Sequence, residues 1–129
     1  ADLVYCDPPY ISKKSGGTDY KFYYHFLNGM INYDTWKENI DRSVKTKRLE
    51  YEKSVWNDKD EIHDAFDRLF EKFQDSIIAV SYNTEGIPSV EELKEMMEEY
   101  KDDVRVEAKG YQYALSESDD VKEVLIVGS

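Results

Sequence analysis

The sequence contains a single cysteine, Cys6, and no apolar run that approaches the ~20 residues of a membrane-spanning helix. One cysteine excludes a disulfide within the chain and fits a reducing compartment. No secretory signal peptide is visible. These features predict a cytoplasmic protein that has no membrane partner.

Basic residues are scarce as well, because 17 Lys and Arg stand against 28 Asp and Glu and give a net charge of −11. Non-specific affinity for nucleic acid comes mainly from Lys and Arg, so the chain is poorly suited to neutralise phosphates unaided. The basic residues that do cluster form two groups: Lys13, Lys14 and Lys21, then Lys45, Lys47, Arg48 and Lys53. The first group could contact a DNA backbone or belong to an ordinary solvated loop.

Glycine is limited to six residues, and no two of them have the Gly-x-Gly spacing of a nucleotide-binding loop. Gly16 and Gly17 follow a polar segment instead of a strand, which makes them a poor phosphate cradle. Metal chemistry is not expected either, because His25 has no second ligand at a useful spacing and His63 lies inside a predicted helix.

What the chain does have is enough apolar material for a core, with 40% hydrophobic and 14% aromatic residues among its 129. Its length corresponds to one domain or part of one. Apolar runs predict buried strands at 3–6 and 76–82, and further strands at 104–108 and 121–127. Helices are expected after Asp34, after Asp58 and after Ser89, with apolar residues of the second at 62, 66, 69, 70 and 73. A short strand at 49–55 is a further possibility.

These elements predict an α/β fold with mainly parallel strands that ends in an antiparallel hairpin, with helices packed on the faces. The connection from 109 to 120 is too short for a crossover helix, so the last two strands must be antiparallel. If the strands at 3–6 and 76–82 are parallel neighbours, the residues that follow them lie at one edge of the sheet.

The first strand runs directly into Asp7-Pro8-Pro9-Tyr10. Each proline fixes its own backbone and biases the preceding residue toward extended geometry, so Asp7 and Tyr10 lie on a stiff segment. An ionised carboxylate and free carbonyls accept hydrogen bonds from a planar amino group, while a tyrosine ring offers a stacking surface. The tetrapeptide therefore indicates a pocket for a flipped nucleobase. The alternative is a rigid turn that merely closes the strand.

Residues 4–10, Val-Tyr-Cys-Asp-Pro-Pro-Tyr, closely resemble the catalytic motif of Dam-like DNA adenine methyltransferases, which use S-adenosylmethionine. Residues 25–30 (His-Phe-Leu-Asn-Gly-Met) and 33–36 (Tyr-Asp-Thr-Trp) are similar to the segment after this motif in members from restriction-modification systems. Residues 79–86 are similar to the strand and turn that follow. The resemblance implies a site-specific, adenine-specific DNA methyltransferase.

The resemblance also assigns roles to the motif residues. It implies that Asp7 and Pro8 bind the amino group to be methylated, and that Tyr10 stacks on the extruded adenine. Pro9 would line the substrate site beside Tyr10, and Asp7 would also lie against the cofactor. The implied catalytic set is therefore Asp7, Pro8 and Tyr10.

The missing Gly-x-Gly loop suggests that residues 1–129 form a single partial domain, the second half of a Rossmann-like methyltransferase sheet. The cofactor-loop half and a target-recognition domain are then expected upstream, and this part would be inactive alone. Double-stranded DNA would be the partner of the complete enzyme, with a restriction endonuclease possible in the same system. The alternatives are an acidic protein-interaction module derived from a methyltransferase, and amino-methylation of RNA.

The segment from 11 to 32 is rich in aromatic residues and has no clean period. It is expected either to cover the base pocket as a lid or to pack against another domain.

Overall fold

The computed structural model describes residues 1–12, 20, 24–45, 47, 49, 53–109 and 122–129. Several expectations lie outside this range: the basic group Lys13, Lys14 and Lys21, residue Arg48, the Gly16-Gly17 pair, and residues 110–120 of the connection expected from 109 to 120. None of the helices among the described residues is long and apolar enough to cross a membrane.

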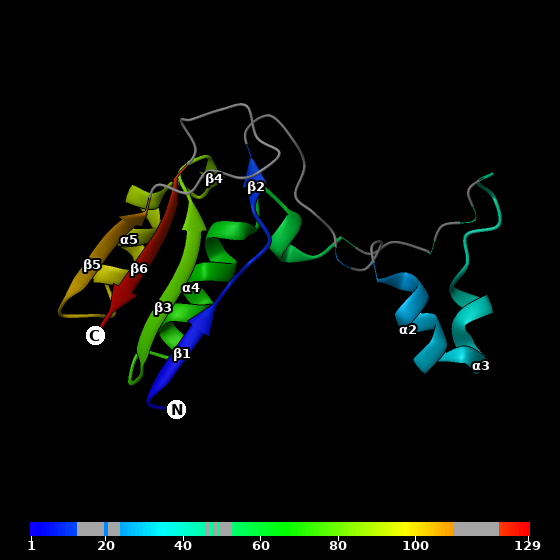
Figure 1. Ribbon diagram of the computed structural model, residues 1–129, viewed down its shortest axis with the longest axis horizontal. Helices are drawn as coiled ribbons and strands as arrows, with labels where there is room; N and C mark the ends of the chain where they lie inside the picture. The colour runs from blue at the N-terminus through cyan, green and yellow to red at the C-terminus, as the bar shows by residue number, and fades with distance from the viewer. Residues whose placement is uncertain (13–19, 21–23, 46, 48, 50–52, 110–121) are drawn as a thin grey trace.

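A four-stranded sheet forms the centre of the fold, in the order β1-β3-β6-β5 (Figure 1). Its strands are β1 (Leu3–Cys6), β3 (Ile77–Asn83), β6 (Glu123–Gly128) and β5 (Val104–Lys109). β1 and β3 are parallel, whereas β6 pairs antiparallel with both β3 and β5. The α/β class and the final antiparallel hairpin are thus confirmed. The described sheet has one parallel pairing, because antiparallel β6 lies beside β3.

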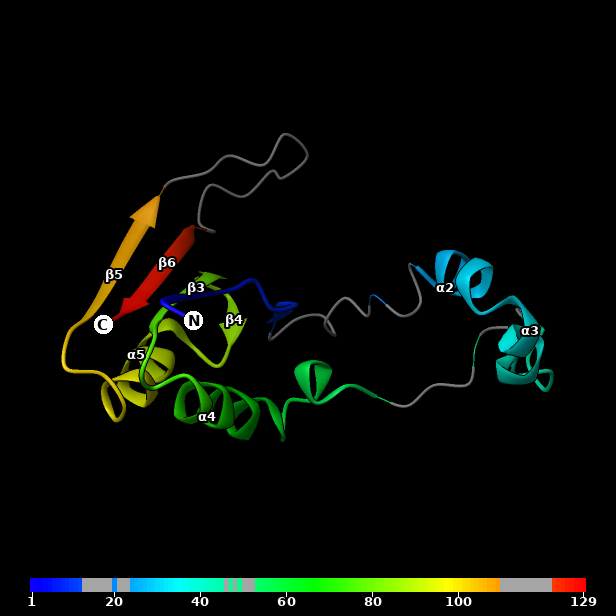
Figure 2. The same ribbon diagram turned by 90° about the horizontal axis from the view of Figure 1, so that it is seen from below.

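Helices α4 (Ile62–Lys72) and α5 (Val90–Glu98) lie together on one face of this sheet (Figure 2). The predicted apolar period of α4 is confirmed, because its Ile62, Phe66 and Phe70 are buried against the strands. The helix begins later than Asp58, with Glu61 at the N-cap position. The capping box of Ser89 and Glu92 at the start of α5 is present as predicted.

The other face of the sheet is not covered by any helix of the described residues (Figure 2). Leu3 is 57% exposed, Tyr5 62%, Ile77 44% and Leu125 38%. The expectation that 3–6 is a buried strand is therefore wrong for this face. A short apolar run shows that a strand forms, but it does not show which of its two faces other elements cover.

The buried side chain of Lys101 binds the backbone that follows the carboxyl end of α4. Its ammonium group donates to the backbone carbonyls of Phe73, Gln74 and Ser76. These carbonyls follow the last turn of the helix, where backbone acceptors lack helical partners and a cation is favourable. Lys101 therefore ties the segment after α5 to the segment that enters β3.

Two short helices, α2 (His25–Ile31) and α3 (Tyr33–Trp36), lie well apart from the sheet in both views (Figures 1 and 2). The expectation that Asp34 caps a longer helix is wrong, because Asn32 holds that position and α3 gives way to the 3₁₀ turn Lys37–Asn39. The suggested strand at 49–55 is not formed in its described residues. Leu49 makes only an isolated bridge with Ile40.

Candidate active site

The motif Asp7–Tyr10 lies at the carboxyl end of β1, beside the end of parallel β3. The pairing of β1 with β3 ends at Cys6 and Val80, directly before Asp7. On its other side, the two-residue strand β2 (Ile11–Ser12) pairs with β4 (Gly86–Ile87), which follows β3. The same β3–β4 segment therefore anchors both flanks of the tetrapeptide. This confirms that the turn after β3 and the motif share one edge of the sheet.

The motif presents its polar groups outward. The side chain of Asp7 is exposed, whereas Pro8, Pro9 and Tyr10 are half-buried. Between described residues, no hydrogen bond uses the backbone carbonyl of Asp7, Pro8 or Pro9. A carboxylate and free carbonyls on one stiff segment can accept hydrogen bonds from an amino group.

Tyr10 links this polar edge to the core. Its ring lies edge-on to the ring of Tyr82, with centroids 5.5 Å apart and an interplanar angle of 83°. The Tyr82 ring in turn meets Phe66 of α4 edge-on at 6.0 Å. A Cβ atom at Gly86 would lie 2.4 Å from the Tyr82 ring, so only glycine fits there. The direction of the Tyr10 ring is therefore fixed by fully packed aromatic neighbours.

The Tyr10 hydroxyl points back toward the carboxylate, and donates to Oδ1 of Asp7 over 3.4 Å. Burial is the main reason that the pKa of Tyr10 is raised, and a hydrogen bond with Ser81 works in the opposite direction. Burial likewise raises the pKa of Tyr82. Both phenols are therefore neutral at physiological pH, and Asp7 is the acidic residue of the motif.

A cavity of about 220 Å³ borders the motif, and its lining consists of Cys6, Asp7, Pro8, Pro9, Trp56 and Leu69. Burial raises the pKa of the Cys6 thiol. Cys6 is therefore a packing residue and a poor nucleophile. Sequence reasoning missed Trp56 and Leu69, because nothing in their local pattern distinguishes a cavity wall from ordinary core.

The cavity lining is largely apolar and contains one carboxylate, that of Asp7. The apolar residues are Cys6, Pro8, Pro9, Trp56 and Leu69. Such a donor set fits a flat organic ring that carries amino groups better than a metal ion. Within the part of the chain that the structure describes, no group of three or more His, Cys, Asp and Glu residues has the arrangement of a metal site. Helices α2 and α3 do not lie over the motif in either view, so their described residues form no lid here.

Comparison with known proteins finds similarity to segments of restriction-modification enzymes. Type II methyltransferase M.NlaIII of Neisseria lactamica is 31% identical over 99 residues, 77% of this chain and 27% of that protein. Type II methyltransferase M.FokI of Planomicrobium okeanokoites is 32% identical over 99 residues, 77% of this chain and 14% of that protein. Modification methylase LlaI of Lactococcus lactis subsp. lactis is 29% identical over 113 residues, 87% of this chain and 17% of that protein.

The chain therefore spans about a quarter or less of the length of these relatives. No family model matches the chain. The comparison with solved structures gave no match either. The similarity agrees with the resemblance seen in the motif, and it extends over most of the chain.

Proposed function

We propose that this chain forms the catalytic part of a DNA methyltransferase that transfers a methyl group from S-adenosylmethionine to the exocyclic amino group of a flipped adenine. The observation that carries the proposal is the position of the Asp7–Tyr10 motif. It lies at the carboxyl edge of the sheet, anchored on both flanks and with its carboxylate exposed. Similarity to two type II methyltransferases and a modification methylase supports the same reaction class.

In this mechanism the chain mainly positions the substrate. Asp7 and the Pro8 carbonyl accept the two amino hydrogens of adenine, which draws the nitrogen lone pair out of conjugation with the ring. The ring of Tyr10 stacks on the base, and Pro9 lines the site beside it. With its lone pair freed in this way, the amino nitrogen would be aimed at the methyl group that the cofactor would supply, and it would lose its extra proton to solvent after transfer. The Asp7 carboxylate stabilises the positive charge that grows on the nitrogen.

The cofactor supplies an electrophilic methyl group on a sulfonium centre. Asp7 and the apolar wall of the motif cavity are the residues of this chain that suit it. The proposal assigns the glycine-rich loop, which these residues lack, to polypeptide outside them. It also places recognition of the DNA sequence there, since the net charge of −11 does not favour phosphate contacts by this part.

The test is transfer of labelled methyl groups to duplex DNA by the native protein that contains this chain. Loss of a preorganised charge partner costs ~10²–10³ in rate, so we expect Asp7→Ala to lose at least that factor. Asp75→Ala is the matched control, because Asp75 is also an exposed carboxylate and lies in the turn between α4 and β3. Label should appear in 6-methyladenine.

Transfer to RNA and not to DNA would change the substrate class and keep the chemistry. Absence of transfer to any nucleic acid would favour a protein-interaction module. The exposed apolar side chains of β1, β3 and β6 on the uncovered face would then be the surface to examine.

A further inference from the structure

Trp56 connects the motif cavity to a small turn in front of α4. The residue lies in the 3₁₀ turn η2 (Val55–Asn57), and its ring forms part of the wall of the cavity beside Asp7 and the two prolines. The ring also packs edge-on against Phe66, with centroids 5.2 Å apart. The indole thus contacts the core through Phe66 and also borders the cavity.

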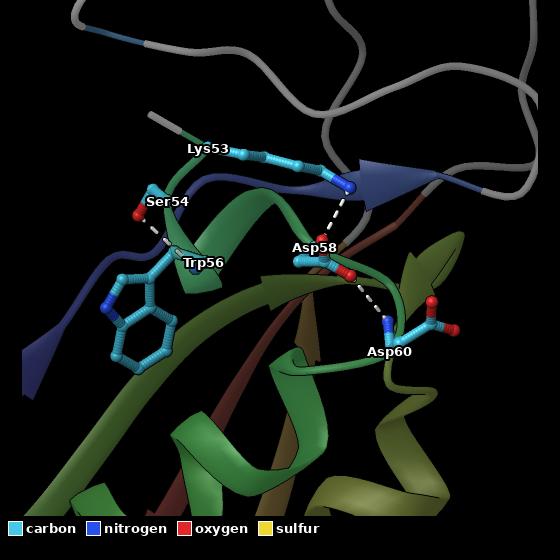
Figure 3. A network of polar contacts seen from close by, with 5 residues as sticks. All are labelled: Lys53, Ser54, Trp56, Asp58 and Asp60. Carbon is cyan, nitrogen blue, oxygen red and sulfur yellow. Dashed lines mark hydrogen bonds and ion pairs between the residues drawn. The ribbon is translucent and has the colours of Figure 1, made fainter. Parts of the chain in front are cut away.

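Polar contacts close this turn at both ends (Figure 3). Before the turn, the Ser54 hydroxyl accepts a hydrogen bond from the Trp56 amide over 3.3 Å. Across the turn, the Lys53 ammonium lies 2.7 Å from Oδ2 of Asp58. The other oxygen of Asp58 accepts from the Asp60 amide over 2.9 Å.

Asp58 is the residue that joins these contacts to the rest of the fold. Its carboxylate pairs with Lys53, and its backbone carbonyl accepts from the amides of Glu61 and Ile62 at the start of α4. The hydrogen bond from Lys53 is the main reason that the pKa of the Asp58 carboxyl is lowered. In Figure 3 the Trp56 ring points away from this network, toward the strands.

The cavity is small for a complete ligand. Pockets that bury drug-sized molecules have volumes of about 300–1,000 Å³, whereas this one has about 220 Å³. A single flat ring system with an amino group matches its size, its apolar walls and its one carboxylate. Adenine is such a ring, and both S-adenosylmethionine and the proposed target base carry it.

We propose that Asp58 is a positioning residue: paired with Lys53, it holds Trp56 as the aromatic wall of the motif cavity against an adenine ring. This inference rests on the proposed function. It assigns a role to residues that touch no reacting atom and lie far from the motif in the sequence. A purely structural role for Asp58 would affect folding and leave ligand affinity unchanged.

The experiment measures two constants on the native protein that contains this chain. One is the dissociation constant of S-adenosylmethionine by calorimetry, and the other is KM for a duplex that the wild type methylates. The variants are Trp56→Leu, Trp56→Phe, Asp58→Asn, Asp58→Glu and the double variant Trp56→Leu/Asp58→Asn. Glu98→Gln is the matched control, because it breaks the exposed ion pair between Lys94 and Glu98 on α5.

We expect Trp56→Leu to raise either the dissociation constant of S-adenosylmethionine or KM for the duplex by about tenfold. Trp56→Phe keeps an aromatic ring and disturbs folding less, so it should raise the same constant by a smaller factor. Asp58→Asn should raise the same constant by about two- to fivefold and leave kcat unchanged. Asp58→Glu, which keeps the carboxylate, should restore the wild-type constant. In the Trp56→Leu background Asp58→Asn should have no further effect. A change in cofactor affinity identifies the adenine of the cofactor, and a change in KM for DNA identifies the target base.

The inference is overturned if the wild type is active and both constants stay unchanged in Trp56→Leu and Trp56→Phe. It is also overturned if the effects of Trp56→Leu and Asp58→Asn simply add. Both outcomes leave the proposed function intact. A wild-type protein that neither binds S-adenosylmethionine nor transfers methyl groups overturns the proposed function and this inference together.

Discussion

The covered face of the sheet and its carboxyl edge are built in opposite ways. On the covered face, Phe66 and Phe70 of α4 and Ile78 of β3 have no exposed surface, and they belong to one buried core cluster. At the edge, Asp7 is exposed and its neighbours are half-buried. The first region stabilises the fold by apolar burial, and the second holds polar groups where a ligand can reach them.

This contrast makes a clear division of mutational effects. Changes on the covered face should reduce the free energy of unfolding. Changes at the carboxyl edge should reduce activity and leave the free energy of unfolding unaltered. Asp7→Ala, the test of the proposed function, is a change at the carboxyl edge. The variants below test the division from the largest expected effect to the smallest.

Phe70→Ala should produce the largest loss of stability. Truncating a buried phenylalanine removes its transfer free energy and leaves a cavity, which costs about 3–5 kcal/mol. Denaturant-induced unfolding of the native protein measures the change. The matched variant is Leu125→Ala, on the uncovered face, where the side chain is 38% exposed. Equal losses for the two variants would mean that the uncovered face is buried as deeply in the native protein.

The sequence was informative wherever a pattern is local. The α4 period, the capping box of Ser89 and Glu92 and the strand before Asp7 all depend on neighbours within a few positions. The α/β class and the closing hairpin followed from element lengths. These elements form as expected because local propensity and sequence pattern agree with the fold in these segments.

Long-range features were not predictable in the same way. The exposure of Leu3 and Tyr5 depends on which elements cover a face, and a short apolar run carries no such information. The place of Trp56 beside the motif depends on how η2 and α4 pack after folding. The prediction of a helix that begins after Asp34 was wrong, because Asn32 ends α2 and is also the N-cap residue of α3. The motif itself was found from the sequence, whereas the roles of its residues stay a prediction.

Lys101→Met should have a smaller effect on the covered region. Lys101 satisfies backbone carbonyls after the end of α4, and hydrogen bonds from charged groups contribute about 1.5–3 kcal/mol. Met keeps the length of the apolar stem and removes the ammonium group. The same unfolding experiment measures the loss, with Lys94→Met on the exposed side of α5 as its control. Similar stability of the two variants would show that water replaces the ammonium group at the three carbonyls.

Variants of Tyr10 test the contribution of the carboxyl edge to binding of the target base. Replacing Tyr10 by Ala removes a stacking surface, which we expect to weaken target-base binding by ~1–3 kcal/mol. Tyr10→Phe should be mild, because it keeps the ring and loses only the hydroxyl, with its long hydrogen bond to Asp7 and its contact with Ser81. KM for duplex DNA at saturating cofactor is the measurement, with the free energy of unfolding as the reference. Wild-type KM values in both variants would remove Tyr10 from the base site.

Tyr82 belongs to both regions and gives the smallest expected change. Its ring lies between Phe66 in the core and Tyr10 at the edge, and its buried hydroxyl has no hydrogen-bond partner among the described residues. Removing a buried unsatisfied hydroxyl is neutral or slightly stabilising, so Tyr82→Phe should change the free energy of unfolding by no more than ~1 kcal/mol.

Tyr82→Phe should also keep the KM for duplex DNA, because the edge contact that orients Tyr10 comes from the ring. Tyr82→Leu, which removes the ring, should lower both stability and base binding. A loss of base binding in Tyr82→Phe alone would mean that the hydroxyl itself serves the site. The ring of Tyr82 would then belong to the core, and its hydroxyl oxygen would belong to the candidate site.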